Sequence, residues 1–237
     1  MQLFFQPDFK AHQTSVAFNK DESRHITKVL RKKEGDQIVI TNGNGLMANA
    51  ELGVVTPKHC EAFVLAVKKE APLPYELHLA VAPTKNNDRF EWFLEKATEI
   101  GISQITPIIC QHSERKQINW ERYNKIMVSA VKQSLKAFMP ALNPLTTYSD
   151  FIKEITVSKN TTNLIAHCYT GEKPLLKDSL KNSDSVVIAI GPEGDFSQEE
   201  VATATAAGFS AISLGEQRLR TETAAVVACT TVAVLKT

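Results

Sequence analysis

Beyond residue 74, short apolar runs alternate with helical patterns, and this alternation constrains the fold of the 237-residue chain more than any other feature. The run 186–190 is apolar without polar alternation, as expected for a central parallel strand that is covered on both faces. Strands that alternate with helices predict an α/β domain on a parallel sheet, in which ligands bind beyond the carboxyl ends of the strands. We expect strands at 76–82, 104–110, 163–168, 185–190 and 211–214, and helices at 88–100, 120–138, 198–207 and 222–235.

Residues 1–71 differ from the rest of the chain, because their apolar segments are short and are separated by turn signals. Two Asn-Gly pairs, at 42–43 and 44–45, lie between two of these segments. They indicate a hairpin, since a tight primed turn needs positive φ. We expect strands at 2–5, 15–18, 37–41, 46–53 and 60–68.

One helical segment, 21–33, interrupts these strands and carries Ile26, Val29 and Leu30 on one face. Several short strands with hairpin turns predict a small β-barrel or a compact sheet domain. The Pro-x-Pro at 72–74 suits a linker, because proline cannot donate a hydrogen bond to a neighbouring strand. The sequence therefore predicts two domains, 1–71 and 72–237.

Composition excludes several classes of protein. Hydrophobic residues make up 43% and charged residues 22% of the chain, which is ordinary globular usage. The longest weakly polar stretch, 223–235, is too short to cross a bilayer, and the N-terminus lacks the pattern of a signal peptide. We therefore expect no membrane segment. The four cysteines are widely separated and form no C-x-x-C pair, so we expect buried, reduced thiols and no metal site. Reduced thiols in turn indicate a cytoplasmic location.

The net charge of +1 argues against a protein that holds nucleic acid by bulk charge, so any nucleic-acid site must be local. Such a surplus occurs at 20–33, where six basic side chains stand against Asp21 and Glu22 at its start. Phosphate contacts from this segment would supply affinity rather than sequence reading, and a solvated basic face is the alternative.

The first unusual loop follows the strand expected at 185–190 and reads Gly191-Pro-Glu-Gly194-Asp195-Phe196. Ser197 and Glu200 then form a capping box at the start of a helix. Two glycines around Pro-Glu suit a stiff turn that a ligand can approach closely, although a plain strand-to-helix turn is an alternative. The chain contains no phosphate-binding G-x-x-x-x-G-K-[ST] loop and no G-x-G-x-x-G after a strand.

The second unusual loop follows the last expected strand and reads L-G-E-Q-R-L-R-T-E-T over 214–223. A helix start would explain Thr221 as a cap and Glu222 as a partner of the helix dipole, but it explains neither arginine. The helix that follows has small side chains all round. It must therefore pack closely against another helix, a threaded loop or a second subunit.

These two loops resemble motifs of the knotted SPOUT methyltransferases, namely I-G-P-E-G at 190–194 and L-G-x-x-x-L-R-T-E-T-A at 214–224. The closest resemblance is to the family that methylates N3 of a single uridine in 16S ribosomal RNA. The chain departs from that family's pattern with Asp195 for Gly, Glu216–Gln217 for Pro-Arg, Lys132 for Glu and Lys136 for Arg, and an arginine expected near the N-terminus is missing from residues 1–5. Matches elsewhere in the chain are His25, Val29, Leu30, Arg31, Lys85, Glu91, Lys96, Glu99, Gly101, Pro107, Gln133 and Pro140.

The resemblance implies a trefoil knot in an α/β C-terminal domain, S-adenosylmethionine bound in the knot loops, and a homodimer. It implies an N-terminal PUA-like β-barrel that binds RNA, with 16S rRNA of the small ribosomal subunit as the partner. The alternatives are a SPOUT enzyme that acts on another RNA base or on a ribose 2′-OH, and a non-catalytic ribosome assembly factor with the same fold.

Site residues follow from the resemblance and from the chemistry. Uracil N3 is a weak nucleophile while it keeps its proton, so the enzyme must stabilise charge on the uracil carbonyls. We expect Arg220 to do this, because a guanidinium stays charged and spans two acceptors. Glu222 would orient Arg220 or accept the proton, and His25 and His112 are either general bases or structural. We expect cofactor contacts from Gly191, Gly194, Leu214, Gly215, Leu219 and Thr221, and RNA contacts from Arg24, Lys28, Arg31, Lys32, Lys85 and Arg115.

Overall fold

The computed structural model of the protein describes residues 2–155, 160–180 and 184–236. Contacts divide the chain into two units. The first unit comprises Met1–Pro72 and Val131–Met139, and the second comprises Leu73–Ala130 and Pro140–Thr237. The segment Val131–Met139, which follows in sequence from the second unit, therefore packs with the N-terminal strands.

The first unit is built on a five-stranded sheet with the order β1-β3-β4-β5-β2. Only β1 and β3 are parallel, and register shifts in the β4–β5 pair bend the sheet. One face carries an apolar core, in which the rings of Phe4 and Phe18 meet edge to face. The strands are β1 (Leu3–Phe5), β2 (Ser15–Phe18), β3 (Gln37–Thr41), β4 (Leu46–Val55) and β5 (Cys60–Lys69), so the predicted small β domain is confirmed.

The hairpin between β3 and β4 forms at the two Asn-Gly pairs, as predicted. Gly43 and Gly45 have φ angles of 75° and 87°, which glycine adopts without strain. The side chain of Asn42 accepts hydrogen bonds from the N–H groups of Asn44 and Leu46. The amide side chain therefore holds the turn.

The segment after β2 is helical, but it changes type within a few residues. Helix α1 (Lys20–Arg24) is capped by Asn19, and the π-helix η1 (His25–Val29) follows directly. Ile26 is buried whereas the side chain of Val29 is 66% exposed, so the two do not share one face as predicted. A π-helix has more residues per turn than an α-helix, so α-helical spacing misplaces the side chains within it.

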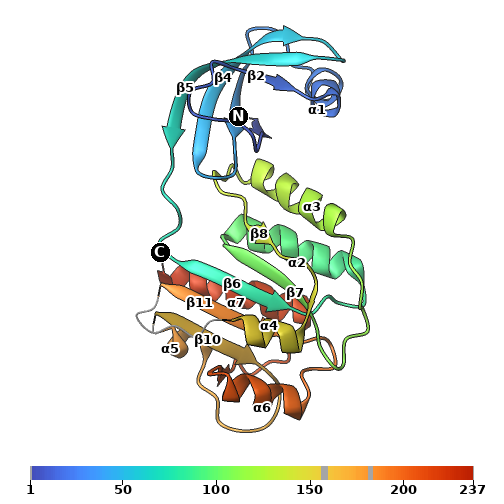
Figure 1. Cartoon of the computed structure of the whole chain (residues 1–237), viewed down its shortest axis with the longest axis vertical. Helices are drawn as coiled ribbons and strands as arrows, with labels where there is room; N and C mark the ends of the chain where they lie inside the picture. The colour runs from blue at the N-terminus through green and yellow to red at the C-terminus, as the bar shows by residue number, and fades with distance from the viewer. Residues whose placement is uncertain (1, 156–159, 181–183, 237) are drawn as a thin grey trace. The chain divides into compact units, whose positions relative to one another are not determined.

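The second unit has a parallel sheet with the order β12-β10-β11-β6-β7-β8, and β9 also pairs with β7 (Figure 1). The strands are β6 (Glu76–Val81), β7 (Gln104–Ile109), β8 (Ala141–Leu142), β9 (Thr146–Thr147), β10 (Thr161–Ala166), β11 (Ser185–Ile190) and β12 (Ser210–Ile212). Ile190 pairs with Val81 on one side and with Ala166 on the other, and Ala166 pairs with Ile212. The loops that follow these strands therefore start at one edge of the sheet.

Helices cover both faces of this sheet, as predicted. Helices α2 and α7 lie against each other on one face, and α4 and α6 contribute to the apolar cluster on the other (Figure 1). The buried side of α7 carries small side chains, including Ala225 and Ala228, which allow close packing against α2. The helices are α2 (Asn87–Ile100), α3 (Trp120–Gln133), α4 (Tyr148–Glu154), α5 (Leu176–Ser179), α6 (Gln198–Ala206) and α7 (Thr221–Lys236).

Helix α3 was predicted to extend to residue 138, but it ends at Gln133. Leu135 has a φ angle of 55°, and this left-handed conformation ends the helix. Within the described residues, no helix combines the length and the hydrophobicity that crossing a membrane requires.

Candidate active site

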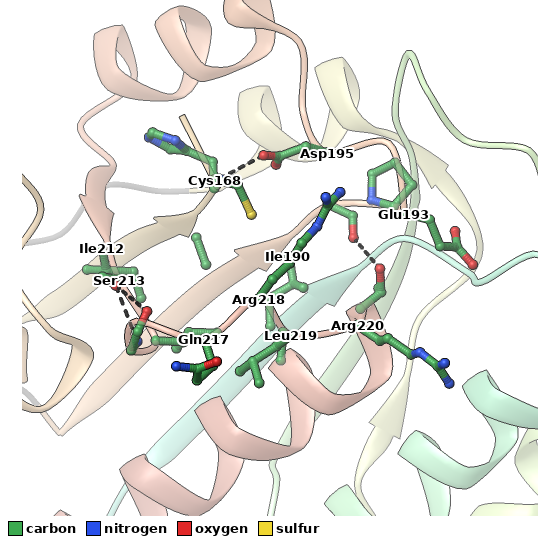
Figure 2. Close-up of a pocket in the computed structure, with 18 of the residues that line it drawn as sticks. Cys168, Ile190, Glu193, Asp195, Ile212, Ser213, Gln217, Arg218, Leu219 and Arg220 are labelled. Atoms are coloured by element: carbon green, nitrogen blue, oxygen red, sulfur yellow. Dashed lines mark hydrogen bonds between the residues drawn. The ribbon is translucent and has the colours of Figure 1, made fainter. Parts of the chain in front are cut away.

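A cavity of about 880 Å³ lies where the loops after β10, β11 and β12 leave the sheet (Figure 2). Its walls are the segments 166–168, 190–195 and 212–221, with Arg89 added from α2 and Lys173 from the loop after β10. Both unusual loops of the sequence therefore contribute to one cavity at the carboxyl edge of a parallel sheet, where ligands bind in folds of this kind. The volume is in the range of small-molecule sites.

The cavity brings together all six residues for which we predicted cofactor contacts: Gly191, Gly194, Leu214, Gly215, Leu219 and Thr221. Thr221 begins α7, and its hydroxyl donates a hydrogen bond of 3.1 Å to the carbonyl oxygen of Gly191. This threonine therefore links the loop after β11 to α7 and does not act as the helix cap that we considered.

The two glycines of the first loop lie where the chain's own packing leaves little room for a side chain. A Cβ atom at Gly194 would lie 2.9 Å from the Cβ atom of His112, and one at Gly191 would lie 3.1 Å from Phe196. His112 also places Nδ1 3.0 Å from the carbonyl oxygen of Asp195. His112 therefore supports the loop from outside the cavity.

Asp195 links the loop after β11 to the loop after β10 by a hydrogen bond, and this role was not predicted from the sequence. Its φ angle is 63°, and one carboxylate oxygen accepts a hydrogen bond of 2.7 Å from the N–H of Cys168. The hydroxyl of Tyr169 donates to the carbonyl oxygen of Phe196 across the same junction. The only signal in the sequence was that Asp195 replaces the glycine common in the family. Cys168, which we predicted to be buried, is exposed.

Arg220 and Glu222 lie on opposite sides of Thr221 and have different environments. Arg220 is exposed and lines the cavity, and within the described residues it forms no ion pair. Glu222 is 6% exposed, and its Oε1 lies 3.8 Å from Nε of Arg89, a residue that the sequence analysis missed. Oε2 of Glu222 is buried and has no hydrogen-bond partner in the described part of the chain.

Lys85 and Arg115 lie at the same edge of the sheet, after β6 and β7. The N–H of Lys85 donates to Glu193 in the loop after β11, and the Lys85 ammonium pairs with Glu114 at 2.7 Å. The guanidinium of Arg115 donates to the carbonyl oxygens of Thr84 and Lys85. The hydrogen bond with Glu114 raises the pKa of Lys85, so this ammonium keeps its charge.

The other four predicted RNA contacts belong to the first unit. Arg24, Lys28 and Arg31 are exposed on or just after the helical segment, and Lys32 is partly exposed. Lys132, which departs from the family pattern, pairs with Glu22 at 2.7 Å within the same unit. Across residues 2–155, 160–180 and 184–236, no group of three or more His, Cys, Asp or Glu side chains is arranged to hold a metal ion.

Comparisons with known proteins agree with this architecture. A family model described as RNA methyltransferase domain matches residues 71–233, and one described as RNA methyltransferase PUA domain matches residues 18–65. Ribosomal RNA small subunit methyltransferase E of Rickettsia conorii is 31% identical over 235 residues, which cover 95% of this chain and 92% of that protein. The protein of the same name from Bacillus subtilis is 28% identical over 215 residues, with coverage of 86% and 84%.

Two solved structures resemble the whole chain. The first is a probable rRNA-methyltransferase from Porphyromonas gingivalis, with a TM-score of 0.91, 38% identity and coverage of 100% of this chain and 98% of that one. The second is ribosomal RNA small subunit methyltransferase E from Neisseria gonorrhoeae bound to S-adenosyl methionine, with a TM-score of 0.87, 27% identity and coverage of 99% and 98%. These matches confirm the family predicted from the two late motifs. The chain belongs to the ribosomal RNA small subunit methyltransferase E family.

Proposed function

We propose that this protein transfers a methyl group from S-adenosylmethionine to N3 of a uridine in 16S rRNA of the small ribosomal subunit. The observation that carries the proposal is the single cavity to which both family motifs contribute. The names of the curated relatives and the S-adenosyl methionine bound in the Neisseria gonorrhoeae structure support the substrate class and the cofactor.

The residues of the cavity fit S-adenosylmethionine. The N–H groups of Leu214 and Leu219 donate to no other group in the described part of the chain, so they are available to a ligand. Gly215 has a φ angle of 127°, which lets the loop turn without a side chain in the way. When bound, the cofactor supplies a methyl group on a positively charged sulfur, which is already a good electrophile.

The chain must therefore activate the uracil ring. Arg220 is exposed and lines the cavity, so its guanidinium can stabilise the negative charge that builds on the uracil carbonyls. Glu222 does not itself line the cavity, so to accept the N3 proton its buried Oε2, which has no partner among the described residues, must become accessible to the bound base. The base must leave any pairing partner before its N3 can reach the methyl group.

RNA is held in this proposal by the domain 1–71 and by the edge of the cavity in the domain 72–237. The exposed charges of Arg24, Lys28 and Arg31, with Lys32, contact phosphates, and this gives salt-dependent affinity. Lys85 and Arg115 contact the RNA close to the reacting base. A substrate of this kind would place the enzyme in the cytoplasm.

The proposal includes a trefoil knot and a homodimer. The hydrogen bond from Thr221 to Gly191 and the packing of α7 against β6 and β11 fit a chain that is threaded through its own loop. Val234 and Leu235 near the end of α7 are 70% and 51% exposed, and burial against a second copy would remove these side chains from water.

The test is nucleoside mass spectrometry of 16S rRNA from a strain that lacks the gene. We expect N3-methyluridine to disappear and to return with the wild-type gene but not with Arg220→Ala. Loss of a 2′-O-methyl nucleoside or of another methylated base would move the assignment to a different RNA atom. An unchanged nucleoside profile would leave the assembly-factor alternative.

A further inference from the structure

Two opposite charges line the cavity from different loops, and the family motifs account for neither. Asp195 comes from the loop after β11, and Arg218 comes from the loop after β12. Figure 2 shows the side chain of Arg218 crossing the cavity towards Asp195 and Cys168, whereas Arg220 points to the other side. The two arginines of the second loop therefore serve different parts of the cavity.

In the described part of the chain, no carboxylate pairs with the guanidinium of Arg218. Apart from Arg220, which points to the other side, the cavity is lined by two further cations, and both are engaged. Lys173 donates to the carbonyl oxygens of His167 and Tyr169, and Arg89 lies beside Glu222. Within the described residues, Arg218 forms no ion pair and no side-chain hydrogen bond. A guanidinium that projects into a ligand cavity without a partner is available to an anion.

Asp195 is fixed in place but still has acceptor capacity. Its two oxygens accept hydrogen bonds from the N–H groups of Cys168, at 2.7 Å, and Phe196, at 2.8 Å. A carboxylate has about four acceptor positions, so two remain for a ligand. Asp195 and Arg218 form no ion pair with each other in the described structure, and their charges are therefore not neutralised.

Asp195 and Arg218 both lie close enough to Cys168 to shift the pKa of its thiol. Burial raises the pKa of this thiol first, Asp195 raises it further, and Arg218 lowers it. The backbone of Cys168 is itself the donor to Asp195. One end of the cavity thus presents a carboxylate and a guanidinium to the same small volume.

We infer that Asp195 and Arg218 form a subsite for the α-amino acid end of the cofactor, with Arg218 binding its carboxylate and Asp195 its ammonium group. This inference rests on the proposed function. An α-amino acid carries both charges on one carbon, so it matches two opposite charges that face one volume without pairing. A guanidinium presents two parallel N–H donors to a carboxylate, which gives direction as well as affinity.

Calorimetry with two ligands tests the subsite without measuring catalysis. S-adenosylhomocysteine contains the amino acid end, whereas 5′-methylthioadenosine has the same adenosine and sulfur but lacks it. We expect Arg218→Gln and Asp195→Asn each to weaken S-adenosylhomocysteine about tenfold, which corresponds to about 1.4 kcal/mol. Both variants should bind 5′-methylthioadenosine within about twofold of wild type. Asparagine tolerates the left-handed backbone at 195 and keeps one oxygen that can accept from the N–H of Cys168 or Phe196, so binding of 5′-methylthioadenosine also shows whether loss of the other bond disturbs the loop.

Lys177→Gln is the matched control, since Lys177 is an exposed cation on α5 that does not line the cavity. It should leave the affinity for both ligands unchanged. Arg218→Gln with wild-type affinity for S-adenosylhomocysteine would overturn the inference, and Arg218 would then be assigned to RNA phosphate. Asp195→Asn that weakens both ligands equally would also overturn it, because Asp195 would then act only through the loop. If the wild-type protein bound neither ligand, the proposed methyl transfer from S-adenosylmethionine would be refuted, not only the subsite.

Discussion

Replacing Thr221 with valine removes one hydrogen bond while keeping the volume of the side chain. The Thr221 hydroxyl donates to the carbonyl oxygen of Gly191 at 3.1 Å, and both residues are buried. A buried carbonyl left without its donor costs about 1–3 kcal/mol, so we expect Thr221→Val to lower the free energy of unfolding by about 2 kcal/mol. For a chain of this length, that loss lowers the thermal midpoint by roughly 4–8 °C. The affinity for S-adenosylhomocysteine should fall as well, because the bond joins two walls of the cavity.

Urea unfolding followed by circular dichroism measures the change in stability. Thr223→Val is the control, because Thr223 lies on the same helix, is partly buried and donates no side-chain hydrogen bond in the described structure. This variant should stay within about 0.5 kcal/mol of wild type. Equal unfolding midpoints for the two variants would show that the link from α7 to the loop after β11 does not stabilise the fold.

Three further predictions address the chemistry, RNA binding and pH. Arg220→Ala should reduce turnover by about a hundredfold or more and change cofactor affinity less than about twofold, and equal loss of both would make Arg220 structural. Reversing the charges of Arg31 and Lys32 should weaken rRNA binding and reduce the slope of log affinity against log salt by about two, with cofactor affinity unchanged. Burial lowers the pKa of His78 to about 4, whereas the unfolded side chain titrates near 6.5. The unfolded chain therefore takes up a proton first, so stability should be full above about pH 6.5 and should fall by up to about 3 kcal/mol towards pH 4. Urea titrations across this range should show that His78→Gln flattens the slope.

The sheet of the second unit could be predicted because its strands are distinctive. The run 186–190, which forms most of β11, is apolar throughout, and α2 has clear helical periodicity. Helix α4 was missed because it has seven residues, too few for a repeat to stand out. Its buried Tyr148, Phe151 and Ile152 do follow helical spacing. The end of α3 was misplaced because nothing in the sequence marks Leu135 as left-handed.

The part of the candidate site that lies within the two late motifs could be predicted from the sequence. The two late motifs identified the six cavity residues because parallel strands bring their carboxyl ends to one edge. Arg89 lies more than a hundred positions from Glu222 in the chain, and only the packing of α2 against α7 brings them together. The hydrogen bond between Asp195 and Cys168 could not be predicted from the sequence for the same reason, because it joins the loops after two neighbouring strands.

The most direct test of methyl transfer uses purified protein, S-adenosylmethionine with a labelled methyl group, and small ribosomal subunits from a strain that lacks the gene. Digestion of the 16S rRNA to nucleosides then shows where the label lies. We predict label in N3-methyluridine with the wild type and none with Arg220→Ala. Label in any other nucleoside, or no transfer by a wild-type protein that binds the cofactor, would contradict the proposed reaction.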